Sequence, residues 1–111
     1  MSTIFGKILK GELPATIVYQ NEHLIVIKDL YPVAPVHLLI IPRIEVPSIQ
    51  ELAEKDLSVM KEIVKAAQHV AREFDVEDNY RLLTNNGEEA GQTIFHLHFH
   101  LIGGRKLGSM A

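Results

Sequence analysis

The most regular pattern of polar and apolar positions lies near the C-terminal end of the chain. In the segment from Gln92 to Gly104, QTIFHLHFHLIGG, three histidines alternate with apolar residues. Successive side chains of a β-strand point to opposite faces, so the pattern predicts a strand with His96, His98 and His100 on one face and a core on the other. Same-face neighbours lie roughly 6.5–7 Å apart at Cα, close enough for one phosphoryl group or one metal ion to bridge two imidazoles.

Four other segments predict strands. Segments 15–20 (ATIVYQ) and 23–29 (HLIVIKD) are rich in β-branched residues and flank a short polar connection, as in a hairpin. Segment 36–42 (VHLLIIP) is almost continuously apolar, which predicts a strand buried on both faces. Segment 80–84 (YRLLT) predicts a short strand, so the chain contains five strands in all.

Two segments have helical spacing. Segment 3–9 places apolar residues three and four positions apart and stops at a glycine, which predicts a short helix. Segment 57–74 repeats apolar residues every three or four positions, which predicts a long helix covering one sheet face. Ser48 and Glu51 match a capping-box pattern, so we expect this helix to begin there or about one turn later, near Lys55.

The composition fits one small globular domain. The 111 residues suffice for one core, and we predict a single α+β domain, 1–111, with a five-stranded, mainly antiparallel sheet, one short helix and one long helix.

The net charge of −3 and the lack of a lysine and arginine cluster argue against a nucleic-acid partner. The absence of cysteine excludes disulfides and thiolate metal sites. No apolar run is long enough to span a bilayer and no signal peptide is evident, so we expect a soluble cytoplasmic protein without a membrane partner.

Two polar residues stand where the pattern makes them unusual. His37 interrupts the apolar strand 36–42 and needs a hydrogen-bond partner, either the backbone or the histidine strand beside it. Asp29 ends the hairpin, before a loop that two prolines keep extended. Its carboxylate either bonds its own backbone in a turn or accepts both hydroxyls of a ribose.

The loop before the histidine strand, NNGEEAGQT at 85–93, offers groups that suit a phosphate. Its two glycines allow the backbone to approach a ligand closely, and Asn85, Gln92 and Thr93 supply neutral donors. The same composition also fits an ordinary hairpin loop. Neither a Walker-type GxxxxGK[ST] motif nor a GxGxxG motif occurs in the sequence.

These segments together resemble a known family. HLHFHLI fits the signature H-φ-H-φ-H-φ-φ, where φ is apolar, of the histidine triad (HIT) superfamily. TIFGKILKGELPA, KDLYPVAPVHLLIIP and NNGEEAGQTIFHLHFHLIGGR resemble its nucleotide-binding branch, the purine nucleoside phosphoramidases. The resemblance covers nearly the whole chain. It implies a HIT-like fold, a two-fold homodimer and hydrolysis of purine nucleoside phosphoramidates, with no cofactor.

The resemblance also implies a role for individual residues. His98 would be the nucleophile on the α-phosphorus, with His96 and His100 as its flanking partners. His37 would support proton movement, and Asp29 would hold the ribose hydroxyls. The base pocket would be lined by Ile4, Phe5, Ile8, Ile27 and Leu30. The phosphate and the leaving group would be surrounded by Asn85, Gly91, Gln92 and Thr93.

The sequence departs from the family pattern at two of these positions and in its tail. Relatives often have Phe where this chain has Ile27, and Ser where it has Thr93. The C-terminal tail, which helps to select substrates in the family, contains no aromatic residue here.

The expected ligands are purine nucleoside monophosphate derivatives such as AMP, GMP or adenosine. A neutral imidazole can attack phosphorus and form a nucleotidyl-histidine that water hydrolyses, while neutral donors stabilise the phosphoryl charge. A dinucleoside polyphosphate hydrolase and a nucleotide-binding interaction module remain alternatives. A zinc enzyme is a further alternative, because H-x-H with a third histidine nearby is a good zinc half-site. The histidine strand contains neither a cysteine nor a carboxylate, and we expect no bound metal.

Overall fold

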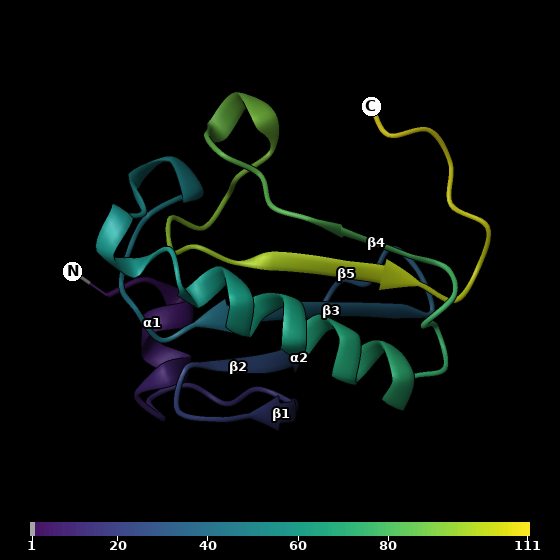
Figure 1. Cartoon of the computed structure of the whole chain (residues 1–111), viewed down its shortest axis with the longest axis horizontal. Coiled ribbons are helices and arrows are strands. Elements are labelled where there is room, and N and C mark those ends of the chain that lie inside the picture. The colour runs from purple at the N-terminus through teal and green to yellow at the C-terminus, as the bar shows by residue number, and fades with distance from the viewer. Residues whose placement is uncertain (1) are drawn as a thin grey trace.

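The computed structural model describes residues 2–111 and confirms the predicted α+β architecture (Figure 1). Its sheet consists of β1 (Ile17–Gln20), β2 (Leu24–Lys28), β3 (Val36–Pro42), β4 (Tyr80–Leu83) and β5 (Phe99–Gly103). The strands lie in the order β1-β2-β3-β5-β4, and every neighbouring pair is antiparallel. The strand that carries the last histidine of the triad therefore lies inside the sheet, between β3 and the edge strand β4.

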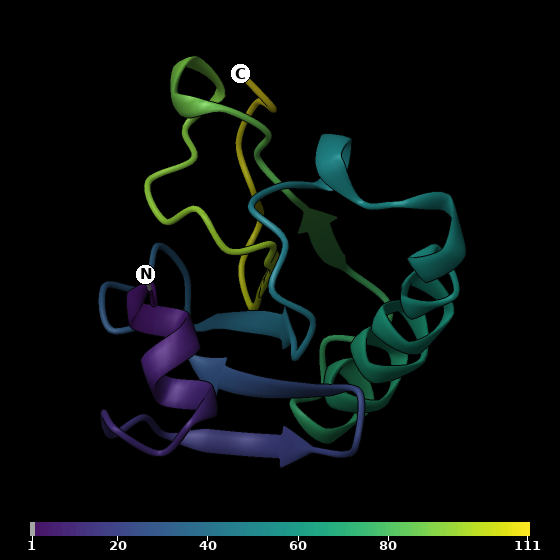
Figure 2. The same cartoon turned by 90° about the vertical axis from the view of Figure 1, so that its left-hand side faces the viewer.

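The two α-helices lie on opposite faces of the sheet (Figure 2). The short helix α1 (Ile4–Leu9) begins where the Thr3 hydroxyl accepts a hydrogen bond from the Gly6 N–H at 3.1 Å. The long helix α2 (Val59–Glu73) crosses the other face. Three short 3₁₀ turns complete the fold: η1 (Ile49–Glu51), η2 (Glu54–Asp56) and η3 (Glu88–Ala90). Among residues 2–111, no helix combines the length and apolar character needed to cross a membrane.

The core has two parts because β2 and β3 bury side chains on both faces. Leu24 and Val26 of β2 face α2, whereas Ile25 and Ile27 face α1. This double burial explains why the sequences of the two central strands are almost continuously apolar. The small helix α1 covers only part of its face, where Phe5 packs on the sheet, and so leaves room beside it for a cavity.

Two local predictions need correction. The regular part of the histidine strand begins only at Phe99, because the chain bends around His96 and the Leu97 N–H donates to the carbonyl of Val46 at 2.8 Å. The long helix begins at Val59, after two 3₁₀ turns, and the Ser48 side chain makes no capping hydrogen bond. The capping-box prediction was therefore wrong.

Candidate active site

A cavity of about 470 Å³ lies on the α1 face of the sheet, the face opposite α2. Its volume falls within the usual range for small-molecule sites. Eleven of the residues predicted for the site line it: Ile4, Phe5, Ile8, Ile27, Asp29, Leu30, Asn85, Gly91, Thr93, His98 and His100. Three others, His37, His96 and Gln92, are buried outside its wall. The cavity therefore joins the N-terminal helix, the loop after β2, the loop after β4 and the histidine segment.

His98 is held in one orientation and in one tautomer. Its Nδ1 lies 2.7 Å from the carbonyl oxygen of His96, and because a carbonyl only accepts, Nδ1 carries the proton. The Phe5 ring meets the imidazole edge to face, with ring centroids 4.8 Å apart. The hydroxyl of Thr84 donates to the His98 carbonyl at 2.6 Å and fixes the backbone. Burial lowers the pKa of His98, which favours a neutral ring with a free lone pair on Nε2.

His37 meets the histidine segment, as one of the two sequence interpretations predicted. Its Nε2 lies 2.9 Å from Nδ1 of His100, across the β3–β5 pair. The Val33 N–H donates to Nδ1 of His37 at 3.1 Å, so the proton of a neutral His37 sits on Nε2. His37 therefore donates to His100, and the proton of a neutral His100 sits on its own Nε2, the nitrogen away from His37.

The His100 ring is neutral in the ligand-free protein at pH 7. Burial, followed by the positive charges that His98 and His37 would carry, lowers the pKa of His100 to about 4. The Asp29 carboxylate acts in the opposite direction and partly offsets this effect. An anionic group bound next to His100 would raise the pKa of this histidine again, because an opposite charge nearby favours the protonated form.

Asp29 makes the local turn contact that was one of its two sequence interpretations, and its role in holding a ribose stays a prediction. Its Oδ1 accepts the Tyr31 N–H at 2.8 Å in a local turn, and its Oδ2 lies 3.3 Å from His37 Nε2. An ionised carboxylate offers about four lone-pair sites, so roughly one site on each oxygen is left for other donors. Two neighbouring hydroxyls, as on a ribose, match that pair of acceptors.

His96 and Gln92 serve the backbone instead of the cavity. His96 is 3% exposed and donates from Nε2 to the Pro42 carbonyl at 2.9 Å, and so holds the bend against the end of β3. Gln92 is 2% exposed. Its Oε1 accepts the Gly87 N–H at 2.9 Å, and its Nε2 donates to the carbonyls of Pro47 and Ile94 at 2.7 and 3.1 Å. These hydrogen bonds hold the loop before the histidine segment in one conformation, and Gly91 and Thr93 of this loop line the cavity.

The sequence interpretation missed some residues of the cavity wall. The additional wall residues are Pro14, Ala15, Thr16, Lys28, Tyr31, Leu39 and Ile94. Lys28 is the one lysine or arginine among all the residues that line the cavity. Lys28 and Tyr31 flank Asp29 and Leu30 in the chain, and this proximity in sequence is the one signal that could have identified them.

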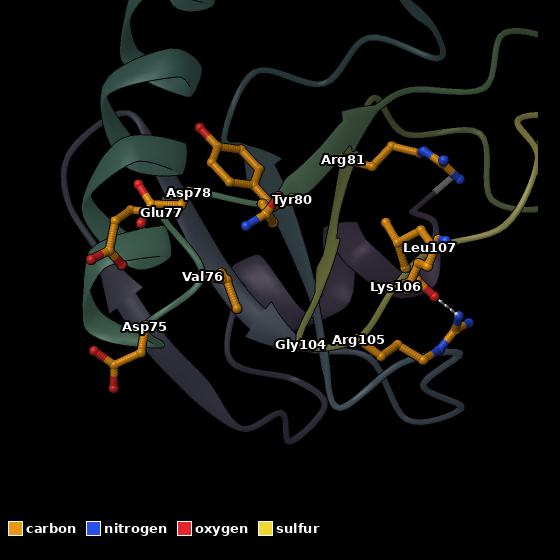
Figure 3. A pocket seen from close by; sticks show the side chains of 11 residues that line it. Asp75, Val76, Glu77, Asp78, Tyr80, Arg81, Gly104, Arg105, Lys106 and Leu107 are labelled. Carbon is orange, nitrogen blue, oxygen red and sulfur yellow. Dashed lines mark hydrogen bonds between the residues drawn. The ribbon is translucent and has the colours of Figure 1, made fainter.

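A second, larger cavity has different chemistry. It measures about 780 Å³ and lies where the turn after α2 meets the start of β4 and the segment after β5 (Figure 3). Asp75, Glu77 and Asp78 lie along one side, and Arg81 and Arg105 along the other (Figure 3). This cavity contains no histidine and none of the residues predicted for the site. The candidate active site is therefore the smaller cavity.

One group of possible metal ligands lies at the edge of this site. It consists of Asp29, His37 and His100, whose ligand atoms lie within 4.8 Å of one another. Nδ1 of His37 accepts the Val33 N–H, and Nδ1 of His100 faces Nε2 of His37. A zinc ion needs unprotonated nitrogens pointing at one centre, so binding it here would break this chain of hydrogen bonds. The donor set does not fit a preformed metal site.

Comparison with known proteins agrees with the histidine triad pattern. A family model of the HIT domain matches residues 10–107. An uncharacterized HIT-like protein of Chlamydia muridarum is 48% identical over 111 residues, which cover 100% of this chain and 88% of that protein. The purine nucleoside phosphoramidase of Escherichia coli K12 is 42% identical over 109 residues, covering 97% of this chain and 92% of that enzyme. The solved structure of a HIT family hydrolase from Clostridium thermocellum matches with a TM-score of 0.93 and 48% identity, covering 97% and 95% of the two chains. The chain belongs to the HIT domain family.

Proposed function

We propose that this single-domain protein hydrolyses purine nucleoside phosphoramidates through a nucleotidyl intermediate on His98. The observation that carries the proposal is the hydrogen bond from His98 Nδ1 to the His96 carbonyl, which leaves Nε2 as an unprotonated nucleophile beside the cavity. The name of the Escherichia coli relative, purine nucleoside phosphoramidase, supports the substrate class.

The cavity has an apolar part suited to a purine and a polar part suited to the ribose and phosphate. Ile4, Phe5, Ile8 and Ile27 supply apolar side chains near α1, where a flat base can be buried. Asp29 offers its two remaining acceptor sites to the ribose hydroxyls. A nucleotide bound in this way would have its α-phosphorus toward His98, which lines the same cavity.

Two residues that line the cavity offer neutral hydrogen-bond donors for the phosphoryl oxygens. These donors are the Asn85 amide and the Thr93 hydroxyl, whereas the Gly91 N–H already donates to the Glu88 carbonyl at 3.0 Å. Gly91 has φ +104°, a conformation that glycine adopts without strain and that brings its backbone to the cavity surface. Donors fixed in place stabilise the charge that spreads over the phosphoryl oxygens during transfer.

The reaction divides into two displacements. The phosphoryl charge first raises the pKa of His100, which takes up a proton. His98 Nε2 forms a bond to phosphorus, the P–N bond breaks, and its electron pair stays on the leaving nitrogen, which receives the Nε2 proton of His100. A water oxygen then attacks phosphorus, the P–Nε2 bond breaks with its electron pair returning to His98, and the water proton returns to His100 Nε2.

The low positive charge of the cavity wall favours a phosphoramidate substrate over a dinucleoside polyphosphate. A polyphosphate brings several negative charges, and phosphate-binding sites usually meet them with lysine, arginine or a metal. The cavity wall offers Lys28 alone, beside Asp29. An amine leaving group requires a proton, which His100 can deliver.

The function is tested by the turnover of a panel of AMP-linked amines, AMP anhydrides and dinucleoside polyphosphates. We expect the amines to have the highest kcat/KM by at least about tenfold. A preference for dinucleoside polyphosphates would select that alternative. Nucleotide binding without turnover of any compound would select the interaction module.

We also propose that two copies form a homodimer. The strand β4 lies at the sheet edge, and its outer backbone groups have no strand partner within residues 2–111. Two apolar side chains are also exposed in the α2 region: Leu57, just before α2, exposes 49% of its surface, and Val64, within α2, exposes 45%. A second copy would cover both features. Light scattering at micromolar concentration should give twice the mass of the chain, and a stable monomer would contradict the dimer.

A further inference from the structure

A third proton on the His37–His100 pair would point two N–H groups at each other. In the neutral pair, the His37 proton lies between its Nε2 and Nδ1 of His100, which are 2.9 Å apart. A doubly protonated His100 carries a second N–H on Nδ1, which would point at the Nε2–H of His37. His37 cannot move its own proton to Nδ1, because that nitrogen accepts the Val33 N–H at 3.1 Å.

The carboxylate of Asp29 is placed to relieve this conflict. Its Oδ2 lies 3.3 Å from Nε2 of His37, and one of its carboxylate oxygens lies within 4.8 Å of a ring nitrogen of His100. The Asp29 backbone is fixed by its N–H, which donates to the His37 carbonyl at 3.0 Å. The Asp29 carboxylate is thus a hydrogen-bond acceptor close to the His37 Nε2–H and the His100 Nδ1–H, which would otherwise point at each other.

We propose that Asp29 is a positioning residue for proton transfer: it accepts the Nε2–H of His37 whenever His100 is doubly protonated, and so allows the pair to hold the proton that the leaving group takes. This inference rests on the proposed function and adds to Asp29 a role that does not depend on the ribose. In the first displacement, the Nε2 proton of His100 moves to the leaving nitrogen and the Nδ1 proton stays on the ring. In the second, water returns a proton to Nε2.

The surroundings of His100 support this role for Asp29. The charged or titratable groups around it are His37 on β3, His98 just before β5, and Asp29 after β2. Both neighbouring histidines lower the pKa of His100 when protonated, whereas Asp29 raises it. Lys28 lines the same cavity, and α1 presents apolar side chains there. Asp29 is therefore the anionic group among these neighbours.

The kinetic test separates the two roles of Asp29. A substrate with a 2′,3′-dideoxyribose has no hydroxyls for the carboxylate, so the ribose role is removed from the comparison. With an amine leaving group on this sugar, we expect Asp29→Asn to lower kcat by about 10–100-fold. This loss is smaller than the roughly 10²–10⁴-fold that a general acid itself supplies, because His100 remains in place. With a nitrophenolate leaving group, which departs without a proton, the loss should be less than about threefold. Glu54→Gln, which removes an exposed carboxylate from η2, is the control and should leave both rates unchanged.

An equal loss with both leaving groups, or no loss with the dideoxy amine, would overturn the role in proton transfer. A second measurement needs no turnover and so stands apart from the proposed function. The His100 ring of the ligand-free protein, followed by nitrogen NMR, should be half protonated near pH 4 in the wild type. In Asp29→Asn the same transition should move to lower pH, and an unchanged transition would contradict the proposal even if the enzyme proved to have a different substrate.

Discussion

The Nδ1 atom of His98 lies 2.7 Å from the carbonyl oxygen of His96, only two residues earlier in the chain. This short contact exists because the chain bends at His96 before β5 begins, which turns that carbonyl toward the following imidazole. It fixes the tautomer of His98, and in the proposed reaction it would also stabilise the positive charge that the ring acquires when Nε2 bonds to phosphorus. The bend and the proposed nucleophile therefore form one structural unit.

Replacement of His98 should separate binding from chemistry. We expect His98→Asn to lower kcat and kcat/KM by about 10³-fold or more, because the lost bond to phosphorus forms only along the reaction path. The Kd for AMP should change by less than about threefold, since the Asp29 and apolar contacts remain. Steady-state kinetics and calorimetry measure the two effects. Substantial turnover in this variant would assign the attack to a water molecule.

His96 provides the matched comparison, because it belongs to the same motif but points elsewhere. Its Nε2–H is bonded to the Pro42 carbonyl in a buried position. His96→Asn should cost about 1–3 kcal/mol of unfolding free energy and reduce kcat less than His98→Asn does. Denaturant unfolding and kinetics on the same two variants test this ordering, and a larger kcat loss at His96 would contradict it.

The stability of the protein should fall as the pH drops from about 6.5 to about 4. In the unfolded chain a histidine titrates near 6.5, whereas burial lowers the pKa of His100 to about 4 in the folded protein. Between these values the unfolded state binds more protons, so unfolding becomes easier as the pH falls. After allowance for the partly exposed ring, the loss is about 1–2 kcal/mol, and His98 adds to it in the same direction. Urea unfolding from pH 7.5 to 4 measures the slope, and His100→Gln should flatten it.

Gln92 should be required mainly for stability. Its amide makes three hydrogen bonds to the backbone of Gly87, Pro47 and Ile94. Gln92→Leu leaves those groups without their partner and should lower the unfolding free energy by about 2–3 kcal/mol. Gln50→Leu, at an exposed position on η1, should change it by less than about 0.5 kcal/mol. If Gln92→Leu keeps full stability and only raises KM, the side chain contacts the substrate instead.

Catalysis should not depend on a metal ion. The ring nitrogens of His37 and His100 are engaged with each other and with Val33, and His98 needs its Nε2 lone pair for phosphorus. Dialysis against a chelator should therefore leave kcat/KM for an AMP-linked amine within about twofold of its starting value. Activity that disappears with chelator and returns with zinc would contradict this account.

Period-two and period-three-to-four patterns were enough to predict the five strands and the two helices. They left the partner of His37 open between the backbone and the histidine segment, and the structure selects the histidine segment. They were not enough for His96 and Gln92. The side chain of His96 is set by the Pro42 carbonyl, and that of Gln92 by Pro47, both far away in the sequence. An alternating pattern cannot show where a strand bends to make such contacts.

The same limit explains the capping-box error and the missed cavity residues. Ser48 has a suitable residue three positions later, but the chain forms two 3₁₀ turns before α2, so the pattern matched without the helix. Lys28 and Tyr31 carry no motif of their own. They line the cavity because β2 ends beside it.

The covalent intermediate tests the central claim most directly. The wild-type protein, mixed with an AMP-linked amine that has a fast leaving group, is quenched in acid-free conditions within milliseconds and analysed by mass spectrometry of the intact chain and its peptides. We expect a mass increase of one adenosine monophosphate residue, located on His98 in the peptide that contains the triad, and no such increase in His98→Asn. Complete turnover without an adduct at any time point, or an adduct on His96 or His100, would contradict it.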